Sequence, residues 1–486
     1  MNAPSIFTEA NHRECWITMN DGVRLDTSIF TPLSEQPAGG WPAILLIHGH
    51  GDISCKASMM DRALHYAKRG YLVVAYSVRG QGSSEGLTFH LGAREIFDLQ
   101  DVIDWILAEL PVHPEKLAVC GSSQGGWHAY MAAAHHPQVA TVVPENIIAD
   151  QAELAVSAGC LTRWFFLRTM RRRIMSAGLQ DLARQWAISG EWERLQEWLR
   201  PTSPRLFVKR MRCPIFILHG WHDMGMPANG VIALYEALSG PKKLYLGGGG
   251  HEGQDSAAAA TERTQLIDRW LDYWLKGEAN GIMDEPPITY VQRPGWDSVP
   301  LHAFPTNNAD TQVLYLHVDG TLAVNSPTGP TTPSNVNNVP LNPDYTLRSA
   351  IYDDMAGVAA ALARETITFT SAPLESTRGL LGAPQATFYM LANQSYFQVH
   401  AELYDVAPDG EATLITRGHY GTRRAEPGRH VTVTIDCRAI GYRVAVGHRL
   451  QLVVSNYDAN YVFPYFDPFC VRLYHDQTHP SMITLP

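Results

Sequence analysis

Ser123 lies in a sequence pattern that can turn a serine hydroxyl into a nucleophile. The pattern is Gly121-Ser122-Ser123-Gln124-Gly125, of the form G-x-S-x-G. It follows a short apolar run, LAVC, and precedes a helix-like stretch, WHAYMAAAHH. A serine on the sharp turn between a strand and a helix exposes its oxygen, and glycines leave the room that a β-carbon would fill. The pattern alone also arises by chance, but this setting favours Ser123 as the nucleophile of an acyl-transfer reaction.

A serine nucleophile needs a histidine base, and the histidine needs a carboxylate that fixes its tautomer. Asp223 follows the apolar run at 215–218 (IFIL), and His251 follows the next apolar run after four consecutive glycines. The order serine, acid, histidine along the chain is the order of the α/β-hydrolase fold. We therefore predict a catalytic triad of Ser123, Asp223 and His251.

Other residues compete for two of these roles. His219 and His222 lie in the same loop as Asp223 but precede it, which breaks the expected chain order. Glu145 and Asp150 follow another apolar run and are the alternative acids. Asp223 could instead cap a turn. Its place beyond the end of a predicted strand favours it as the acid.

The oxyanion that forms during attack needs N–H donors that are already in place. We expect one from the backbone of Gln124, directly after the nucleophile. The other is expected from HGHGD at 48–52, in the loop after the apolar run at 43–47. There His50 is the favoured donor and Gly51 the next choice. The alternative for this loop is a glycine turn that carries a surface histidine.

The elements that must position these residues have the pattern of an α/β fold. Between residues 41 and 275, short apolar runs alternate with amphipathic stretches, which is typical of buried parallel strands and their crossover helices. A further loop, RGQGSSEG at 79–86, predicts a tight turn in which Arg79 is structural. A hairpin is expected over 15–30, strands over 43–47, 71–76, 117–120, 141–143, 215–218 and 243–246, and helices over 58–69, 94–109, 126–135 and 256–276.

The α/β pattern is interrupted between about 145 and 210, where two or three helices with large aromatic faces are expected. These helices could form a cap whose aromatic residues wall an apolar substrate pocket, or the same residues could be the core of the cap. The arginine run at 171–173 favours a solvated helix face over a clamp for a substrate carboxylate. The aromatic residues concerned are Trp164, Phe165, Phe166, Trp186, Trp192 and Trp198.

From residue 288 onward the apolar residues alternate with polar ones, which indicates an all-β sandwich or jelly roll. A stretch rich in Ser, Thr, Asn and Pro at 320–343 predicts a long irregular excursion. The expected division is a hydrolase core in two parts, 1–145 and 211–285, a helical cap at 146–210 between them, and a β-sandwich domain at 286–486.

Composition excludes several other classes of protein. The 486 residues are 45% hydrophobic, which excludes global disorder, and the net charge of -10 argues against binding to nucleic acid. No apolar run approaches the length of a membrane span, and the N-terminus does not resemble a secretion signal, so we expect a cytoplasmic protein. The seven cysteines are scattered without a C-x-x-C pair. We expect reduced thiols, no metal and no organic cofactor.

These motifs resemble two branches of α/β-hydrolase serine esterases. RGQG, GSSQGG and His251-Glu252 are similar to the acetyl xylan esterase and cephalosporin C deacetylase family. Most of 265–456, including RWLDYWLKGEANGIMDEPPITYV, LYLHVDGTL and AELYDVAPDGEATLITRGHY, resembles the cocaine esterase family, which also contains X-prolyl dipeptidyl peptidases and α-amino acid ester hydrolases. The resemblance implies an α/β-hydrolase fold with a C-terminal jelly roll, and a triad at Ser123, Asp223 and His251.

One departure from the cocaine esterase pattern concerns the oxyanion hole. The resemblance implies a tyrosine after the first central strand whose hydroxyl helps to bind the oxyanion, but HGHGD stands there in this chain. The hole is therefore expected to consist of backbone N–H groups, and the substrate profile of that branch does not carry over directly. The sequence also offers no evident anchor for the amino terminus of a peptide.

The sequence therefore predicts a serine hydrolase that cleaves a carboxylic ester through an acyl-enzyme. The alternative keeps the triad but acts as an X-prolyl dipeptidyl peptidase, an amino-acid-ester hydrolase or an acyltransferase. A remote alternative is a non-catalytic carbohydrate-binding protein. The expected partner is a small-molecule ester or acyl substrate, and assembly into a homo-oligomer is left open.

Overall fold

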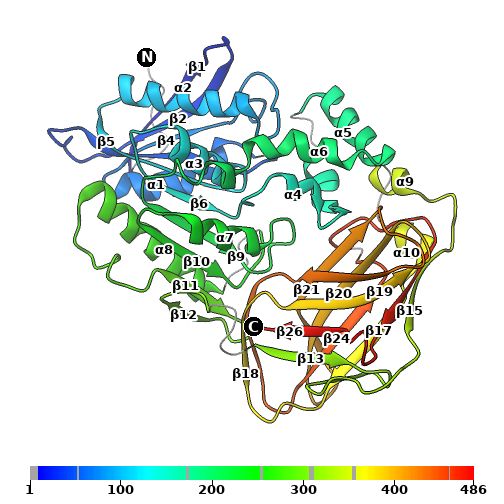
Figure 1. Cartoon of the computed structure of the whole chain (residues 1–486). Helices are drawn as coiled ribbons and strands as arrows, with labels where there is room; N and C mark the ends of the chain where they lie inside the picture. Colours follow the sequence, from blue (N-terminus) through cyan, green and yellow to red (C-terminus); the bar gives the residue numbers. More distant parts are fainter. Residues whose placement is uncertain are drawn as a thin grey trace.

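Two large β-sheets organise the chain, and Figure 1 shows the N-terminal one at the upper left and the C-terminal one at the lower right. The computed structural model describes residues 9–51, 54–170, 175–251, 256–305, 311–352, 357–458 and 460–486. The arginine run at 171–173 lies outside these described residues. Within them, no helix has both the length and the apolar character needed to cross a membrane.

The first sheet has ten strands, and every neighbouring pair from β4 to β11 is parallel. The strands β1 and β2 form the predicted N-terminal hairpin at one edge, and β12 is antiparallel at the other. Across the sheet the order is β1 (Asn11–Thr18), β2 (Arg24–Thr31), β4 (Leu72–Tyr76), β3 (Trp41–Ile47), β5 (Val112–Ser122), β6 (Val139–Glu145), β9 (Ile215–Gly220), β10 (Lys242–Gly247), β11 (Ile288–Gln292) and β12 (Asp297–Leu301).

Helices cover both faces of this sheet, which explains why its central strands are continuous apolar runs. Leu45 and Leu46 of β3 point to opposite faces: Leu45 shares a core cluster with Trp127 of α3, and Leu46 shares another with Trp270 of α8. The predicted α/β-hydrolase architecture is therefore confirmed. On one face lie α2 (Ala93–Glu109), α3 (Gln124–His135) and α7 (Ala228–Ala237), and on the other lie α1 (Met60–Lys68) and α8 (Ala257–Leu271).

Helical segments occupy the predicted insertion between β6 and β9. They begin beyond β6 with a short helix and a small hairpin and continue through a π-helical turn to two longer helices. In Figure 1 these helices lie beside the first sheet and above the second. Their role as a cap over a substrate stays a prediction. The segments are α4 (Ala152–Ala155), β7 (Val156–Ser157), β8 (Cys160–Leu161), the turn Phe165–Thr169, α5 (Ala177–Ser189) and α6 (Trp192–Leu199).

The second sheet curls around its own hydrophobic core, and its strands are antiparallel except where β14 meets β17. Burial alternates along strands such as β19, as the period-two pattern predicted. The expected β-rich C-terminal domain is therefore confirmed. Its strands are β13 (Gln312–Leu316), β14 (Thr321–Ala323), β15 (Ser334–Pro340), β16 (Leu362–Ala363), β17 (Thr366–Ser371), β19 (Gln385–Ala392), β20 (Phe397–Val406), β21 (Ala412–Thr422), β22 (His430–Asp436), β24 (Arg449–Ser455), β25 (Phe469–Tyr474) and β26 (Met482–Leu485).

Two sequence expectations about this half differ from the structure. The alternating pattern places the run that becomes β11 in the sandwich, but β11 pairs in parallel with β10 and extends the first sheet, followed by β12. A five-residue strand does not reveal from its own alternation which sheet it joins. The stretch at 320–343 is also less irregular than expected, because it contains β14 and β15. The division at residue 286 stays a prediction as a domain boundary.

Candidate active site

Ser123 occupies a strained turn between β5 and α3. Its φ of 56° and ψ of −119° are unusual for a residue with a side chain, and its N–H donates to the carbonyl of Glu145 at 2.8 Å. A β-carbon on Gly121 would lie 2.5 Å from the carbonyl oxygen of Ile47, and one on Gly125 would lie 1.9 Å from it. The two glycines of the motif are thus required by the close approach of β3 to the turn.

Asp223 and His251 form a hydrogen-bonded pair beyond the ends of β9 and β10. The Nδ1 atom of His251 lies 2.6 Å from Oδ2 of Asp223. The carboxylate is fully buried, and its other oxygen accepts N–H bonds from Gly225 at 3.0 Å and Met226 at 2.9 Å. Because Nδ1 donates to the carboxylate, Nε2 is the ring nitrogen that can act as a base or an acid toward a substrate or a nucleophile.

Three of the four rival residues are engaged elsewhere. The ring of His219 donates from Nε2 to the carbonyl of Met226 at 2.7 Å, and burial lowers the pKa of His222 to about 4. Asp150 accepts a bond from Ser203 Oγ at 2.8 Å and pairs with Arg205. The alternative acid after β6, Glu145, is paired with Arg62. Of the candidate acids, the structure brings Asp223 to His251.

The loops after β3, β4 and β5 meet through the side chain of Gln124. Its Oε1 lies 2.9 Å from Nδ1 of His50 and accepts a bond from Nε2 of Gln81 at 3.0 Å. The N–H of Gly51 donates to Oε1 of Gln81 at 3.3 Å, so this N–H is already occupied. The two donor residues expected in HGHGD thus differ, since the N–H of Gly51 binds Gln81 while the ring of His50 contacts Gln124.

His48, the first residue of HGHGD, anchors the base of the same loop. Its Nδ1 donates to the carbonyl of Gly49 at 2.7 Å, and its Nε2 accepts the N–H of Val78 at 2.9 Å. Burial lowers the pKa of His48 to about 4, so the ring is neutral at neutral pH. Both ring nitrogens are thereby used to fix the loop in place.

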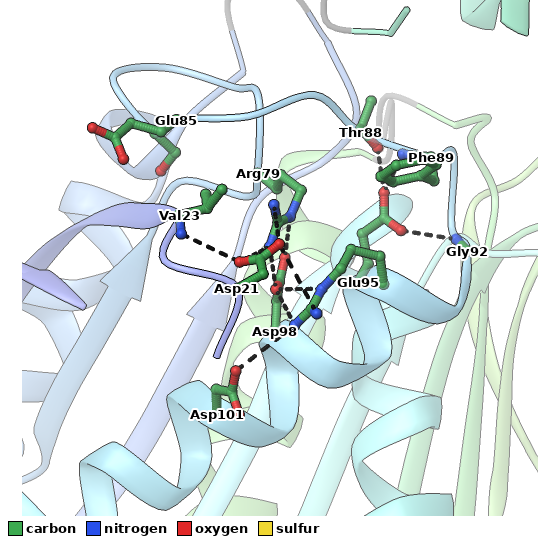
Figure 2. Close-up of polar contacts among 12 residues, drawn as sticks. Asp21, Val23, Arg79, Glu85, Thr88, Phe89, Gly92, Glu95, Asp98 and Asp101 are labelled. Atoms are coloured by element: carbon green, nitrogen blue, oxygen red, sulfur yellow. Dashed lines mark hydrogen bonds and ion pairs between the residues drawn. The ribbon is translucent and has the colours of Figure 1, made fainter. Parts of the chain in front are cut away.

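Arg79 is structural, as its place in RGQG predicted (Figure 2). Its guanidinium is 4% exposed and binds Asp98 through two hydrogen bonds of 2.7 Å. It also contacts Asp21 at 2.9 Å, and Arg94 contacts Asp98 from the other side at 2.9 Å. The hydrogen bonds to Asp98 raise the pKa of Arg79. This buried network ties the loop after β4 to helix α2.

Glu95 fixes the end of that loop at the start of α2. Figure 2 shows its carboxylate among Thr88, Phe89 and Gly92. It accepts bonds from Thr88 Oγ1 at 2.6 Å, from the N–H of Phe89 at 2.6 Å and from the N–H of Gly92 at 3.1 Å. Burial raises the pKa of this carboxyl. His90 and Leu91, which lie between Phe89 and Gly92, are therefore held in a defined conformation.

The described residues around Ser123 enclose a pocket of about 80 Å³. One wall is Trp164, whose ring centroid lies 5.0 Å from that of His251. Trp164 also lines a second pocket of about 290 Å³, together with Arg163 and Tyr461. The lining of the first pocket is His50, His90, Leu91, Ser123, Gln124, Ile147, Leu154, Trp164, Thr169, Met226 and His251.

The aromatic residues of the helical insertion divide between the two roles considered for them. Trp164 lines the pocket, whereas Phe165 and Phe166 are fully buried in the core. Trp198 packs against Phe165 with a centroid distance of 6.1 Å. The sequence did not single out Gln81 or His90, since a buried glutamine in a turn and one histidine among 20 carry no specific signal.

The C-terminal domain reaches the loop that carries Asp223. Arg438, which is 8% exposed, donates to the carbonyl of Asp223 at 3.2 Å and to the carbonyl of Met224 at 2.9 Å. Its guanidinium lies 3.7 Å from the ring centroid of Tyr461. Nearby, Asn229 of α7 exchanges two hydrogen bonds of 2.9 Å with the backbone of 437–439. The second domain therefore supports the acid loop directly.

Comparison with known proteins gives two family matches and relatives along the whole chain. Residues 21–253 match the model of the X-Pro dipeptidyl-peptidase S15 family, and residues 280–466 match the C-terminal non-catalytic domain of X-Pro dipeptidyl-peptidase. A protein of Mycobacterium bovis named as a serine esterase is 23% identical over 98% of this chain and 95% of its own length.

Solved structures share the fold along its full length. A CocE/NonD family hydrolase from Staphylococcus aureus is 14% identical and superposes with a TM-score of 0.75, covering 98% of this chain and 94% of its own. An α-amino acid ester hydrolase is 18% identical with a TM-score of 0.72, covering 100% of this chain and 98% of its own. At these identities the likeness establishes the fold.

Proposed function

We propose that this chain, a serine hydrolase whose residues match both domains of the X-Pro dipeptidyl-peptidase (S15) family, hydrolyses a carboxylic ester through an acyl-enzyme on Ser123. The observation that carries this proposal is the pairing of His251 with a fully buried Asp223 at a pocket that Ser123 also lines. A buried carboxylate of this kind stabilises the imidazolium that forms when the histidine takes a proton.

In the proposed reaction, Nε2 of His251 takes the proton of Ser123 Oγ while Oγ attacks the ester carbonyl carbon. The backbone N–H groups of Gln124 and His50 bind the resulting oxyanion. When this intermediate collapses, the bond to the leaving oxygen breaks and His251 returns the proton to the departing alcohol. A water molecule, deprotonated by His251, then attacks the acyl-enzyme, and the carboxylic acid and the free serine are released.

The lining of the pocket supports an ester over a peptide with a free amino terminus. A substrate ammonium that leaves water needs an opposing carboxylate. Among the described residues that line this pocket none is acidic. The volume of about 80 Å³ also favours a small acyl group, because a single water needs about 10–15 Å³ on the same scale. An X-Pro dipeptidyl-peptidase, an amino-acid-ester hydrolase or an acyltransferase with the same triad is the alternative, and the family matches favour the first of these.

We also propose that the chain divides as the sequence predicted, with a cap at 146–210 that forms one side of the pocket. Support comes from Leu154, Trp164 and Thr169, which lie in this segment and line the pocket. In this arrangement the cap sets the size of the acyl group that reaches Ser123.

The replacement Ser123→Ala tests the proposed nucleophile. The variant should lose at least about 10³-fold in kcat/KM for p-nitrophenyl acetate, because its remaining groups bind the substrate but cannot form the acyl-enzyme. Ser122→Ala, at the adjacent position, is the matched control and should retain activity. A fluorophosphonate should label the wild-type protein and not the Ser123 variant. Equal turnover by the two proteins would refute the role of Ser123.

The substrate class is tested by comparing acetyl esters with glycyl-prolyl p-nitroanilide. The proposal expects the ester to be the better substrate. Faster cleavage of the glycyl-prolyl amide would instead establish the dipeptidyl-peptidase alternative.

A further inference from the structure

His90 is a buried histidine that lines the pocket of Ser123. It is 4% exposed, and within the described part of the chain neither Nδ1 nor Nε2 has a hydrogen-bond partner. Buried polar groups in folded proteins almost always have a partner, since leaving one unpaired costs free energy. The catalytic mechanism proposed above does not involve this ring.

A second group without a partner among the described residues belongs to Gln124, which lines the same pocket. The side-chain oxygen of Gln124 is occupied by His50 and Gln81, which fixes the orientation of the amide. Its Nε2 is buried, and no hydrogen-bond acceptor for it lies among the described residues. Within the described part of the chain, two residues that line the pocket of Ser123 therefore carry polar groups without partners, one an amide with two N–H donors and one an imidazole.

The position of His90 is fixed by the surrounding structure. Both His90 and Leu91 have a φ of 57°, a conformation that residues with side chains rarely adopt. Glu95 holds the flanking residues, as Figure 2 shows, and the N–H of His90 donates to Thr88 Oγ1 at 3.2 Å. Strained residues of this kind persist where the surroundings determine them, and they concentrate at sites that bind ligands.

Aromatic rings hold the imidazole on the side of the pocket toward the helical insertion. Its centroid lies 5.5 Å from the ring of His50 and 5.5 Å from that of Phe165, and it lies 6.1 Å from Trp198. Burial among these rings lowers the pKa of His90 well below its ordinary value, and His50 lowers it further. The ring is therefore neutral and offers one N–H donor and one acceptor nitrogen.

We propose that His90 and the side-chain amide of Gln124 form a subsite for an uncharged hydroxyl group of the ester substrate. A hydroxyl can accept from Gln124 Nε2 and can also contact one nitrogen of the imidazole, either donating to its acceptor nitrogen or accepting from its N–H. A hydroxyl fits this subsite better than a cationic group, because no acidic residue stands among the described lining residues. It also fits better than an amide, because an amide is larger and the pocket has a volume of about 80 Å³. The substrate class is thus an ester with a hydroxyl close to the scissile carbonyl. This inference rests on the proposed ester hydrolysis.

The hydroxyl can lie on either side of the ester bond, and two substrate pairs distinguish these sources. In the acyl pair, kcat/KM is compared for p-nitrophenyl 3-hydroxybutyrate and p-nitrophenyl butyrate. In the alcohol pair, it is compared for glycerol monobutyrate and propyl butyrate. The wild-type protein should prefer the hydroxylated ester by about tenfold in one of the two pairs, since a site built to bind a hydroxyl loses its partner with the plain ester.

His90→Phe removes both nitrogens and keeps a flat ring. In whichever pair the wild-type protein prefers the hydroxylated ester, His90→Phe should lower kcat/KM for that ester about tenfold more than for the plain ester. His90→Asn keeps a hydrogen-bonding group and tolerates the left-handed backbone, so it should restore part of the preference. Trp198→Phe alters the packing against the same ring without removing a nitrogen, and its preference should match that of the wild type.

The inference is overturned if the wild-type protein turns over plain esters but shows no preference in either pair. It is also overturned if His90→Phe slows both members of a pair equally, which indicates a purely structural role. The wild-type comparison decides the matter even if the His90 variants do not fold. A protein that cleaves no ester at all contradicts the proposed function itself, so the two failures remain distinguishable.

Discussion

At the scale of single residues, Asp223 holds its position through three hydrogen bonds that all run into its carboxylate. Two come from backbone N–H groups and one from His251. This arrangement requires two acceptor oxygens, and an asparagine provides only one. The amide NH₂ of an asparagine must therefore oppose an N–H of the loop or the N–H of the histidine. The site thus depends on the charge and on the acceptor geometry of this one side chain.

Asp223→Asn is expected to lower kcat about 10³- to 10⁴-fold while the protein stays folded, because the histidine loses the partner that fixes its tautomer. Steady-state kinetics with p-nitrophenyl acetate and a thermal unfolding curve measure the two effects. Asp181→Asn, which changes an exposed carboxylate on α5, serves as the control and should behave like the wild type. A kcat within tenfold of the wild type would mean that another carboxylate, such as Asp150 or Glu145, supports the base.

Sequence reasoning selected Ser123, Asp223 and His251 because parallel strands end at one edge, so a motif after each strand is brought to a common place. It could not select Gln81 or His90 in the same way. Gln81 matters because its side chain joins two other loops, and His90 matters because it lacks partners among the described residues. Both are properties of the folded neighbourhood, whereas the triad has a pattern along the chain. The roles of the triad themselves remain proposals.

At the scale of elements, the strand β3 and the turn after β5 approach so closely that Gly125 has no space for a side chain. A β-carbon there would lie 1.9 Å from the carbonyl oxygen of Ile47 and 3.2 Å from that of His48. Both atoms belong to the backbone, so they can move away only if β3 or α3 shifts. The contact therefore sets how α3, the helix that follows Ser123, packs on the central strand β3.

Gly125→Ala is expected to destabilise the protein by about 3 kcal/mol or more, because one of these elements must move to accommodate the methyl group. Urea unfolding followed by circular dichroism measures this change. Gly178→Ala is the matched control, since a β-carbon on Gly178 in the first turn of α5 has no atom within 4 Å. The control should be neutral or stabilising by up to about 1 kcal/mol. Equal stability of the two variants would contradict the close approach of β3 to the turn.

The strand β11 is an element at which the prediction of the fold failed. Apolar runs and their periods located the strands of the first sheet through β10 and the change to a β-rich half. The pairing partner of β11 was not predictable, because a run of five residues, ITYVQ, does not reveal which sheet it joins. Its place follows instead from the backbone of β10, which it pairs with from Leu244 to Leu246. Pairing between strands is a long-range property that a local period does not contain.

At the scale of the whole molecule, the C-terminal domain takes part in the geometry of the site. The contact of Arg438 with the carbonyls of Asp223 and Met224 joins residues that are 215 and 214 positions apart in the chain. No local pattern in the sequence predicts such a contact. Through it, the second domain contacts the loop that carries Asp223, the hydrogen-bond partner of His251. We therefore expect Arg438 to be a positioning residue for the proposed acid.

Arg438→Ala should lower kcat for p-nitrophenyl acetate about tenfold, because the loop of Asp223 loses two charge-assisted hydrogen bonds. The change in KM should be smaller, because these bonds hold Asp223 and do not hold the wall of the pocket. Arg438→Lys keeps one charged donor and should recover part of the loss. Arg424→Ala removes an exposed arginine of the same domain, which pairs with Glu193, and is the control without effect. If Arg438→Ala instead lowers the thermal midpoint and leaves kcat unchanged in the folded protein, the second domain only stabilises the first.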